Sequence, residues 1–120
     1  MAYDNGNVFA QILRGEIPNE TVYEDEHVLA FCDPSPARPV HVLVIPRGAY
    51  TDAGDFAANA TESEIAGFWR GVAATAIAVD VSNAGYRLIA NTGENGGQEV
   101  FHFHVHILGG AVVGPMVSPD

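Results

Sequence analysis

The chain has 120 residues, a formal net charge of −10, and 48 % apolar residues. This size and composition indicate a single globular domain with its own core rather than a disordered chain. Its basic residues are few and scattered, namely Arg14, Arg38, Arg47, Arg70 and Arg87. Binding to a nucleic-acid backbone relies on clustered Lys and Arg, so nucleic acid is excluded as a partner. No apolar run reaches the length needed to cross a bilayer, so no membrane association is expected.

Cysteine usage and the first residues bear on the compartment. The single cysteine, Cys32, cannot form a disulfide within the chain. The N-terminus lacks the basic and then apolar pattern of a signal peptide. Both features favour a reducing compartment, and we expect a cytoplasmic protein.

The N-terminal half is predicted to contain a short helix and three strands. The helix spans residues 7–14, with one apolar stripe and Asn7 as its cap. Strands are predicted at 21–23 and 28–33 with a tight turn between them, and at 41–46 after a proline-rich break. The last strand is apolar at every position from 42 to 45, which indicates burial on both faces.

The C-terminal half is predicted to begin with a surface connection over residues 50–60. Thr61 and Glu64 form a capping box that predicts a helix from 62 to about 79. This helix is apolar or small around its whole girth, which suggests that it packs on both the sheet and a partner subunit. A strand is predicted at 86–91, followed by a glycine-rich loop at 92–98.

The predicted order of elements indicates an α+β fold. Hairpin-like connections dominate, so we expect an antiparallel sheet of about five strands with one long and one short helix. The domain comprises residues 1–120, including a short N-terminal extension at 1–6 and a C-terminal tail at 111–120.

Residues 101–108, which read FHFHVHIL, alternate between histidine and large apolar residues. In a β-strand, successive side chains point to opposite faces, so His102, His104 and His106 should form one row. The opposite face would carry the apolar residues of the run and pack on the core: Phe101, Phe103, Val105 and Ile107.

Geometry favours catalysis over metal binding for this row. Adjacent histidines of the row lie about 7 Å apart at Cα and the outer two about 13 Å, so one metal ion could use only two of them. A metal site would need another ligand, such as His41 or Asp33. A row suits an extended anionic substrate better, because the middle imidazole could attack while its neighbours bind oxygens or move a proton.

The segment from His102 to Leu108 resembles the signature of the histidine triad, or HIT, superfamily of nucleotide hydrolases and transferases. The flanking sequence GGQEV at 96–100 and Gly109-Gly110 are similar to the Hint branch, and the resemblance runs from about Val8 to Gly110. It implies a HIT-like fold and a homodimer with a ten-stranded sheet. It also implies hydrolysis of the P–N or P–O bond in purine nucleoside 5′-phosphoramidates or related nucleotidyl conjugates, through a nucleotidyl-histidine intermediate.

The resemblance assigns catalytic roles to four histidines. His104 would be the nucleophile, and His106 would hydrogen-bond or protonate the leaving group. His102 would help to fix the orientation and tautomer of His104, and His41 would join the proton network. No cofactor is required by this scheme, and zinc is an alternative that we do not favour.

The resemblance also predicts a purine nucleotide pocket. Asp33 would bind the ribose hydroxyls and Asn91 the ribose or phosphate, although each could be an ordinary turn or strand-end residue. Phosphate donors would come from Gln98, Glu99 and Val100. The base would contact an apolar set that could equally be core: Val8, Phe9, Ile12, Phe31, Pro34 and Leu43.

Two rival functions and one departure from the family remain. A dinucleoside polyphosphate hydrolase is the nearest rival, and a zinc-binding or nucleotide-binding protein with little catalytic flux is the other. Relatives often carry arginine after the Gly-Gly pair, where this chain has Ala111. That difference leaves the leaving group open.

Overall fold

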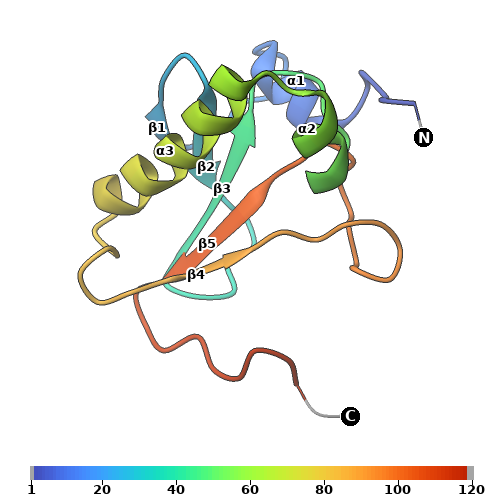
Figure 1. Ribbon diagram of the computed structural model, residues 1–120. Coiled ribbons are helices and arrows are strands. Elements are labelled where there is room, and N and C mark those ends of the chain that lie inside the picture. Colours follow the sequence, from blue (N-terminus) through green and yellow to red (C-terminus); the bar gives the residue numbers. More distant parts are fainter. Residues whose placement is uncertain (1, 119–120) are drawn as a thin grey trace.

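The computed structural model describes residues 2–118, so Met1 and the last two residues of the predicted tail lie outside the described part. Three helices and five strands follow in the order α1 (Val8–Leu13), β1 (Thr21–Glu24), β2 (Val28–Cys32), β3 (Val40–Pro46), α2 (Ala53–Asn59), α3 (Glu62–Ala78), β4 (Arg87–Ile89) and β5 (Val105–Gly109). The strands form one antiparallel sheet in the order β1-β2-β3-β5-β4 (Figure 1). The predicted α+β fold with a five-stranded antiparallel sheet is therefore confirmed.

Helix α2 was missed by the sequence prediction, which treated residues 50–60 as a surface connection. Asp52 caps this helix by accepting a hydrogen bond from the Asp55 N–H at 2.8 Å. The buried Phe56 fastens it to the core by stacking on Phe103, with ring centroids 5.0 Å apart. Two turns held by one cap and one aromatic anchor leave little periodic signal in the sequence.

Helix α3 confirms the predicted capping box and boundaries closely. Glu64 donates its backbone N–H to the Thr61 hydroxyl, and the Glu64 carboxylate accepts from the Thr61 N–H. One face of the helix, including Phe68 and Val72, is buried against the sheet. On the other face Trp69 remains 46 % exposed and Ile77 68 % exposed.

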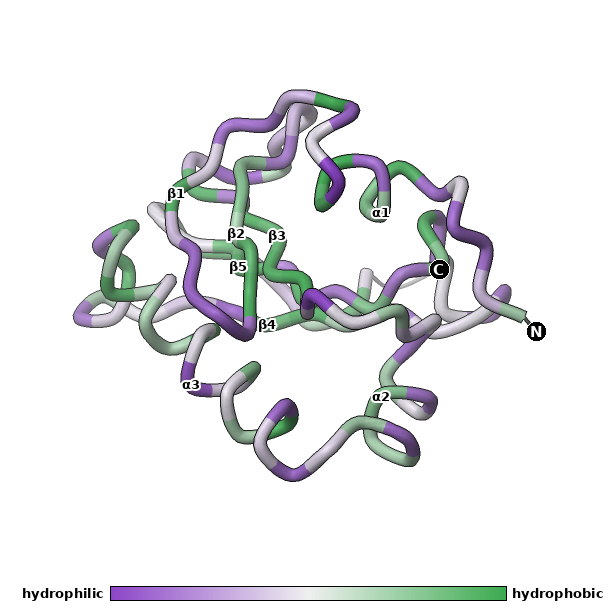
Figure 2. Tube along the Cα trace, turned by 90° about the horizontal axis from the view of Figure 1, so that it is seen from above, coloured by the Kyte–Doolittle hydropathy of each residue, from purple (hydrophilic) through white to green (hydrophobic). Residues whose placement is uncertain are grey.

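The two faces of the sheet are covered differently. Val42 and Val44 of β3 and Val105 and Ile107 of β5 face the layer of α2 and α3, where they form the main core. The intervening residues face α1, which packs over a smaller cluster of Phe9, Ile12, Leu29, Phe31, Leu43 and Ile45. Figure 2 shows α1 on one side of the strands and α2 and α3 on the other. Within residues 2–118, no helix has the length and apolarity needed to span a membrane.

Candidate active site

A pocket of about 210 Å³ opens on the α1 side of the sheet, next to the part of the sheet that α1 covers. Six segments meet there: α1, the loop after β2, β3, the loop after β4, the segment before β5, and β5 itself. Its lining residues are Phe9, Asp33, Pro34, Leu43, Asn91, Gly97, Glu99, Val100, His104 and His106. Predicted catalytic and nucleotide-binding residues are thus brought together from distant parts of the chain.

The predicted regular strand over residues 101–108 is wrong in its first half, because β5 begins only at Val105. The Phe103 N–H donates to the Tyr50 carbonyl at 2.7 Å instead of to a neighbouring strand. Alternation nevertheless persists, since Phe103, Val105 and Ile107 lie in the main core as predicted. His104 and His106 remain adjacent, with ring centroids 5.1 Å apart.

The His102 imidazole does not join the other two in the pocket. It is 0 % exposed, with Nε2 2.9 Å from the Pro46 carbonyl and Nδ1 2.6 Å from the Tyr3 hydroxyl. Its contact with His104 runs through the backbone, because the His102 carbonyl lies 2.7 Å from Nδ1 of His104. All three imidazoles lie on the α1 side of the sheet, where the Phe9 ring is 4.9 Å from His104 and 6.4 Å from His102. Only two of the three line the pocket, because His102 is buried behind it.

The hydrogen bond to the His102 carbonyl fixes the tautomer of His104. A carbonyl oxygen can only accept, so Nδ1 carries the hydrogen and Nε2 keeps its lone pair. Burial, the largest effect, lowers the pKa of His104 from its ordinary value, although the His102 carbonyl and Asp33 oppose the shift. The Phe9 ring packs edge-on against the imidazole at 4.9 Å. At neutral pH His104 is therefore uncharged, held in place, and nucleophilic at Nε2.

His41 assigns the opposite tautomer to His106. The Ala37 N–H donates to Nδ1 of His41 at 3.0 Å, so the hydrogen of His41 is on Nε2. That Nε2 lies 2.9 Å from Nδ1 of His106, which must accept. Neutral His106 then carries its hydrogen on Nε2. Burial, followed by the charges of His104 and His41, lowers the pKa of His106 to about 4.

Asp33 stands beside this pair and completes a group that could surround a metal ion. Its Oδ1 accepts from the Ser35 N–H at 2.8 Å, and its Oδ2 lies 3.4 Å from Nε2 of His41. Ligand atoms of Asp33, His41 and His106 all lie within 4.8 Å of one another. A metal ion would have to replace the hydrogen bond between the two imidazoles, because a ligating nitrogen needs a free lone pair.

The glycine-rich loop departs from the prediction at Gln98. Its side-chain amide donates to the carbonyls of Thr51 and Val100 and accepts from the Gly93 N–H, and its own N–H bonds to the Gly93 carbonyl. Gln98 is thus a buried brace for the loop and has no donor left for a phosphate. Gly97, which belongs to the predicted glycine-rich loop, lines the pocket instead.

Backbone donors remain available in the same loop. Within residues 2–118, the N–H groups of Glu99 and Val100 have no hydrogen-bond acceptor. Both residues line the pocket beside His104, and the Glu99 side chain is exposed. Unpaired backbone N–H groups facing a cleft are suitable donors for phosphate oxygens.

The predicted apolar base contacts divide into three groups. Phe9, Pro34 and Leu43 line the pocket together with Val100. Ile12 and Phe31 lie behind them in the smaller core cluster, and Val8 is exposed outside this pocket, where it borders a neighbouring hollow. The apolar stripe of α1 therefore contributes Phe9 to the pocket wall and Ile12 to the core.

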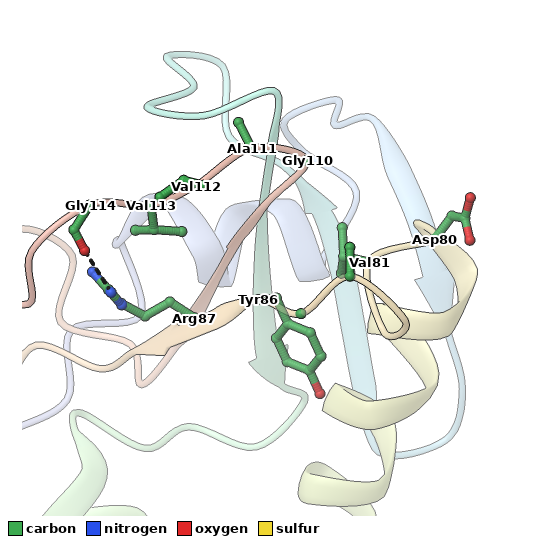
Figure 3. A pocket seen from close by; sticks show the side chains of 11 residues that line it. Asp80, Val81, Tyr86, Arg87, Gly110, Ala111, Val112, Val113 and Gly114 are labelled. Atoms are coloured by element: carbon green, nitrogen blue, oxygen red, sulfur yellow. Dashed lines mark hydrogen bonds between the residues drawn. The ribbon is translucent and has the colours of Figure 1, made fainter.

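A larger hollow, of about 680 Å³, lies away from the histidines (Figure 3). It is bounded by Tyr86, Arg87 and residues 110–114, where the C-terminal tail crosses the sheet edge. Arg87 holds the tail by donating to the Gly114 carbonyl at 2.9 Å and to the Pro115 carbonyl at 3.2 Å. No histidine lines this larger hollow. The histidine pocket is therefore the candidate active site.

A pocket with one imidazole bare at Nε2 and its neighbour protonated there places a chemically competent nucleophile beside a proton donor. The family comparison gives the class of protein: a model described as the HIT domain matches residues 14–112. The chain therefore belongs to the HIT domain family, which confirms the resemblance drawn from its sequence.

Similar proteins support the same assignment over nearly the whole chain. An uncharacterized HIT-like protein of Azospirillum brasilense is 53 % identical over 97 % of this chain and 95 % of its own. Purine nucleoside phosphoramidase of Escherichia coli is 41 % identical over 92 % of both chains. The solved structure of a HIT family hydrolase from Clostridium thermocellum superposes with a TM-score of 0.82 at 36 % identity, covering 96 % of this chain and 99 % of that one.

Proposed function

We propose that the protein hydrolyses purine nucleoside 5′-phosphoramidates, or related nucleotidyl conjugates, through a nucleotidyl intermediate on His104. The observation that carries the proposal is the pair of opposed tautomers: a lone pair on Nε2 of His104 beside an N–H on Nε2 of His106. The similarity to a purine nucleoside phosphoramidase supports the reaction class.

In the first step, Nε2 of His104 attacks phosphorus and the P–N bond of the substrate breaks. The hydrogen on Nε2 of His106 moves to the departing nitrogen, so that a neutral amine leaves. The His104 ring becomes positively charged as the new N–P bond forms. The His102 carbonyl, 2.7 Å from Nδ1, stabilises that charge.

In the second step, water attacks phosphorus and the bond to His104 breaks. Having given up its hydrogen in the first step, His106 carries a negative charge that balances the positive His104 ring and that the His41 N–H stabilises. It now accepts a proton from the water at Nε2 and returns to its neutral tautomer, and a nucleoside monophosphate is released. His41 keeps Nδ1 of His106 supplied with a hydrogen bond in both steps. No step needs a metal ion or another cofactor.

The rest of the pocket would hold the nucleotide. The Asp33 carboxylate would accept from the ribose hydroxyls and Asn91 would contact ribose or phosphate. The phosphate oxygens would receive the N–H groups of Glu99 and Val100. A purine would lie against the wall of Phe9, Pro34 and Leu43.

The intermediate provides the test of this function. The protein would be mixed with an adenosine phosphoramidate, quenched early, and analysed by peptide mass spectrometry. We expect an adenylyl adduct on His104 and none in His104→Asn. Rapid turnover with a label on another residue, or turnover by the Asn variant, would refute the proposal.

Dinucleoside polyphosphate hydrolysis is the nearest rival, because the same attack on phosphorus would serve it. Ala111 stands where relatives often carry arginine, so a basic contact to a second polyphosphate is missing at that position. We expect kcat/KM to be higher for the phosphoramidate than for a diadenosine polyphosphate, and the reverse order would favour the rival.

Zinc binding is a second candidate, because Asp33, His41 and His106 lie close enough to share one ion. Our mechanism uses these groups as a proton network instead. Protein dialysed against a chelator should keep its phosphoramidase activity, with elemental analysis confirming that zinc is absent. Loss of activity that added zinc restores would support the metal function.

We also propose that the protein forms a homodimer through α3 and an edge strand of the sheet, giving a ten-stranded sheet. The support is the exposed stripe on α3, with Trp69 46 % and Ile77 68 % exposed. Replacing both by glutamate should convert a dimer into a monomer in analytical ultracentrifugation. A wild-type protein that sediments as a monomer would exclude this assembly.

A further inference from the structure

The N-terminal segment, residues 2–6, is fastened to α1 and reaches the buried ring of His102, of which the proposed mechanism uses only the backbone carbonyl. Gln11 donates to the Gly6 carbonyl at 2.7 Å, and Arg14 donates to the Asn5 carbonyl at 2.8 Å. This anchoring sets the Tyr3 hydroxyl 2.6 Å from Nδ1 of His102, across 99 positions of sequence. Tyr3 lies outside the residues 14–112 that match the family model, so family membership assigns it no role.

The direction of the Tyr3 hydrogen bond follows from the other side of the ring. Nε2 of His102 faces the Pro46 carbonyl at 2.9 Å, so Nε2 carries the hydrogen. Burial lowers the pKa of His102 to about 4, so the ring is neutral at pH 7 and Nδ1 has only a lone pair. The Tyr3 hydroxyl therefore donates to it.

His102 is in this way a junction between the N-terminal segment and the nucleophile. Its ring is held at both nitrogens, by Tyr3 and by the end of β3, and it is 0 % exposed. Its backbone carbonyl is the acceptor that fixes Nδ1–H on His104. No regular strand pairing constrains residues 101–104, because β5 begins at Val105. The Phe103 N–H, in the same peptide group as the His102 carbonyl, donates to the Tyr50 carbonyl at 2.7 Å. This bond and the side-chain clamp on His102 together take the place of a strand ladder in orienting the carbonyl.

We propose that Tyr3 is a positioning residue for the reaction: its hydroxyl locks His102, and through the His102 carbonyl it keeps Nε2 of His104 bare and aimed into the pocket. Tyr3 touches neither substrate nor the reacting atoms. The kinetic part of this inference rests on the proposed phosphoramidase function, whereas the effect on the His104 tautomer does not.

The experiment compares wild type with Tyr3→Phe in the full chain. Tyr23→Phe is the matched control, because the Tyr23 hydroxyl also makes one hydrogen bond, to Asp25 at 2.8 Å, far from the pocket. We expect Tyr3→Phe to lower kcat about tenfold while KM changes less than about twofold, as is typical for loss of a supporting hydrogen bond. Tyr23→Phe should leave both constants unchanged.

Nitrogen-15 NMR of the histidine rings supplies a readout that a purely structural role would not alter. Wild type should show His104 protonated at Nδ1 only, and Tyr3→Phe should show a mixture of His104 tautomers. Placing 4-aminophenylalanine at position 3 restores an N–H donor and should restore the single tautomer and kcat, which also covers a Phe variant that folds poorly.

Three outcomes would overturn the inference. They are full kcat in Tyr3→Phe, an unchanged His104 tautomer in that variant, and failure of 4-aminophenylalanine to restore the wild-type tautomer. A wild type without phosphoramidase activity would instead remove the proposed function, and the NMR comparison would still decide the role of Tyr3.

Discussion

The two faces of the sheet differ in what they bury. Toward α2 and α3, the side chains of Val42, Val44, Val105 and Ile107 are at most 1 % exposed and form a continuous apolar core. Toward α1, a six-residue helix covers only part of the face, and His104 and His106 line a pocket beyond it. The main core and the histidine pocket thus lie on opposite sides of the same strands. If the proposed function is right, substitutions on the two faces should have separable effects.

The largest expected effect comes from removing the nucleophile on the open face. His104→Asn should lower kcat for an adenosine phosphoramidate by about 10⁴-fold or more, because no other group can form the intermediate. Its melting temperature should stay near that of wild type. His27→Asn is the matched control: this histidine lies at the other face, where it packs on Gly67 of α3, and its loss should leave kcat unchanged.

The second effect probes the covered face. Phe68 is 0 % exposed and packs against Phe56 and Phe103, with ring centroids 5.2 and 5.0 Å away. Phe68→Ala should lower the free energy of unfolding by about 3–5 kcal/mol, as large cavities in cores do. At temperatures where the variant remains folded, kcat should be retained. A variant with unchanged stability and a lowered kcat would contradict the idea that the two faces act separately.

The third effect tests the proton network on the open face. His41→Phe removes the donor to Nδ1 of His106, so the His106 hydrogen can move to that nitrogen and away from the leaving group. With an alkylamine leaving group kcat should fall by about 10²-fold, the usual contribution of a general acid. With a nitrophenolate leaving group, which needs no proton, the loss should be much smaller. Equal losses on the two substrates would show that His41 has another role.

The sequence predicts features that depend on neighbouring residues better than features that depend on contacts between distant residues. The alternation at residues 105–108, the apolar run of β3 and the capping box of α3 are local, and each predicted its element. The irregular start of the histidine run could not be predicted in the same way, because the Phe103 N–H is taken by Tyr50, from a separate loop. The family resemblance assigned Gln98 to the phosphate. Its bonds to Thr51 and Gly93 could not be predicted, because they exist only in the folded loop.

The site was therefore predicted in composition better than in geometry. The pocket residues Asp33, Asn91 and His104 came from the family pattern, and the structure brings them together. The burial of the His102 ring and its bond to Tyr3 join positions 99 residues apart, and no periodicity in the sequence encodes such a contact. Tertiary hydrogen bonds of this kind decide tautomers, and the tautomer decides which ring nitrogen offers a lone pair to the pocket.

The smallest expected effect, counted per pH unit and per histidine, is on stability. Burial lowers the pKa values of both His102 and His106 to about 4, whereas an unfolded histidine titrates near 6.5. Between these values the unfolded chain binds protons that the folded chain does not, so the free energy of unfolding must fall as pH decreases from 6.5 toward 4. The slope should be roughly 1.4 kcal/mol per pH unit for each histidine inside this window, and above pH 6.5 these two groups should contribute none. Urea unfolding at a series of pH values measures the slope, and His106→Asn should remove its share. If stability stayed constant between pH 6.5 and 4.5, these imidazoles would have to accept protons in the folded state, and the neutral pair on which the open face depends would be lost.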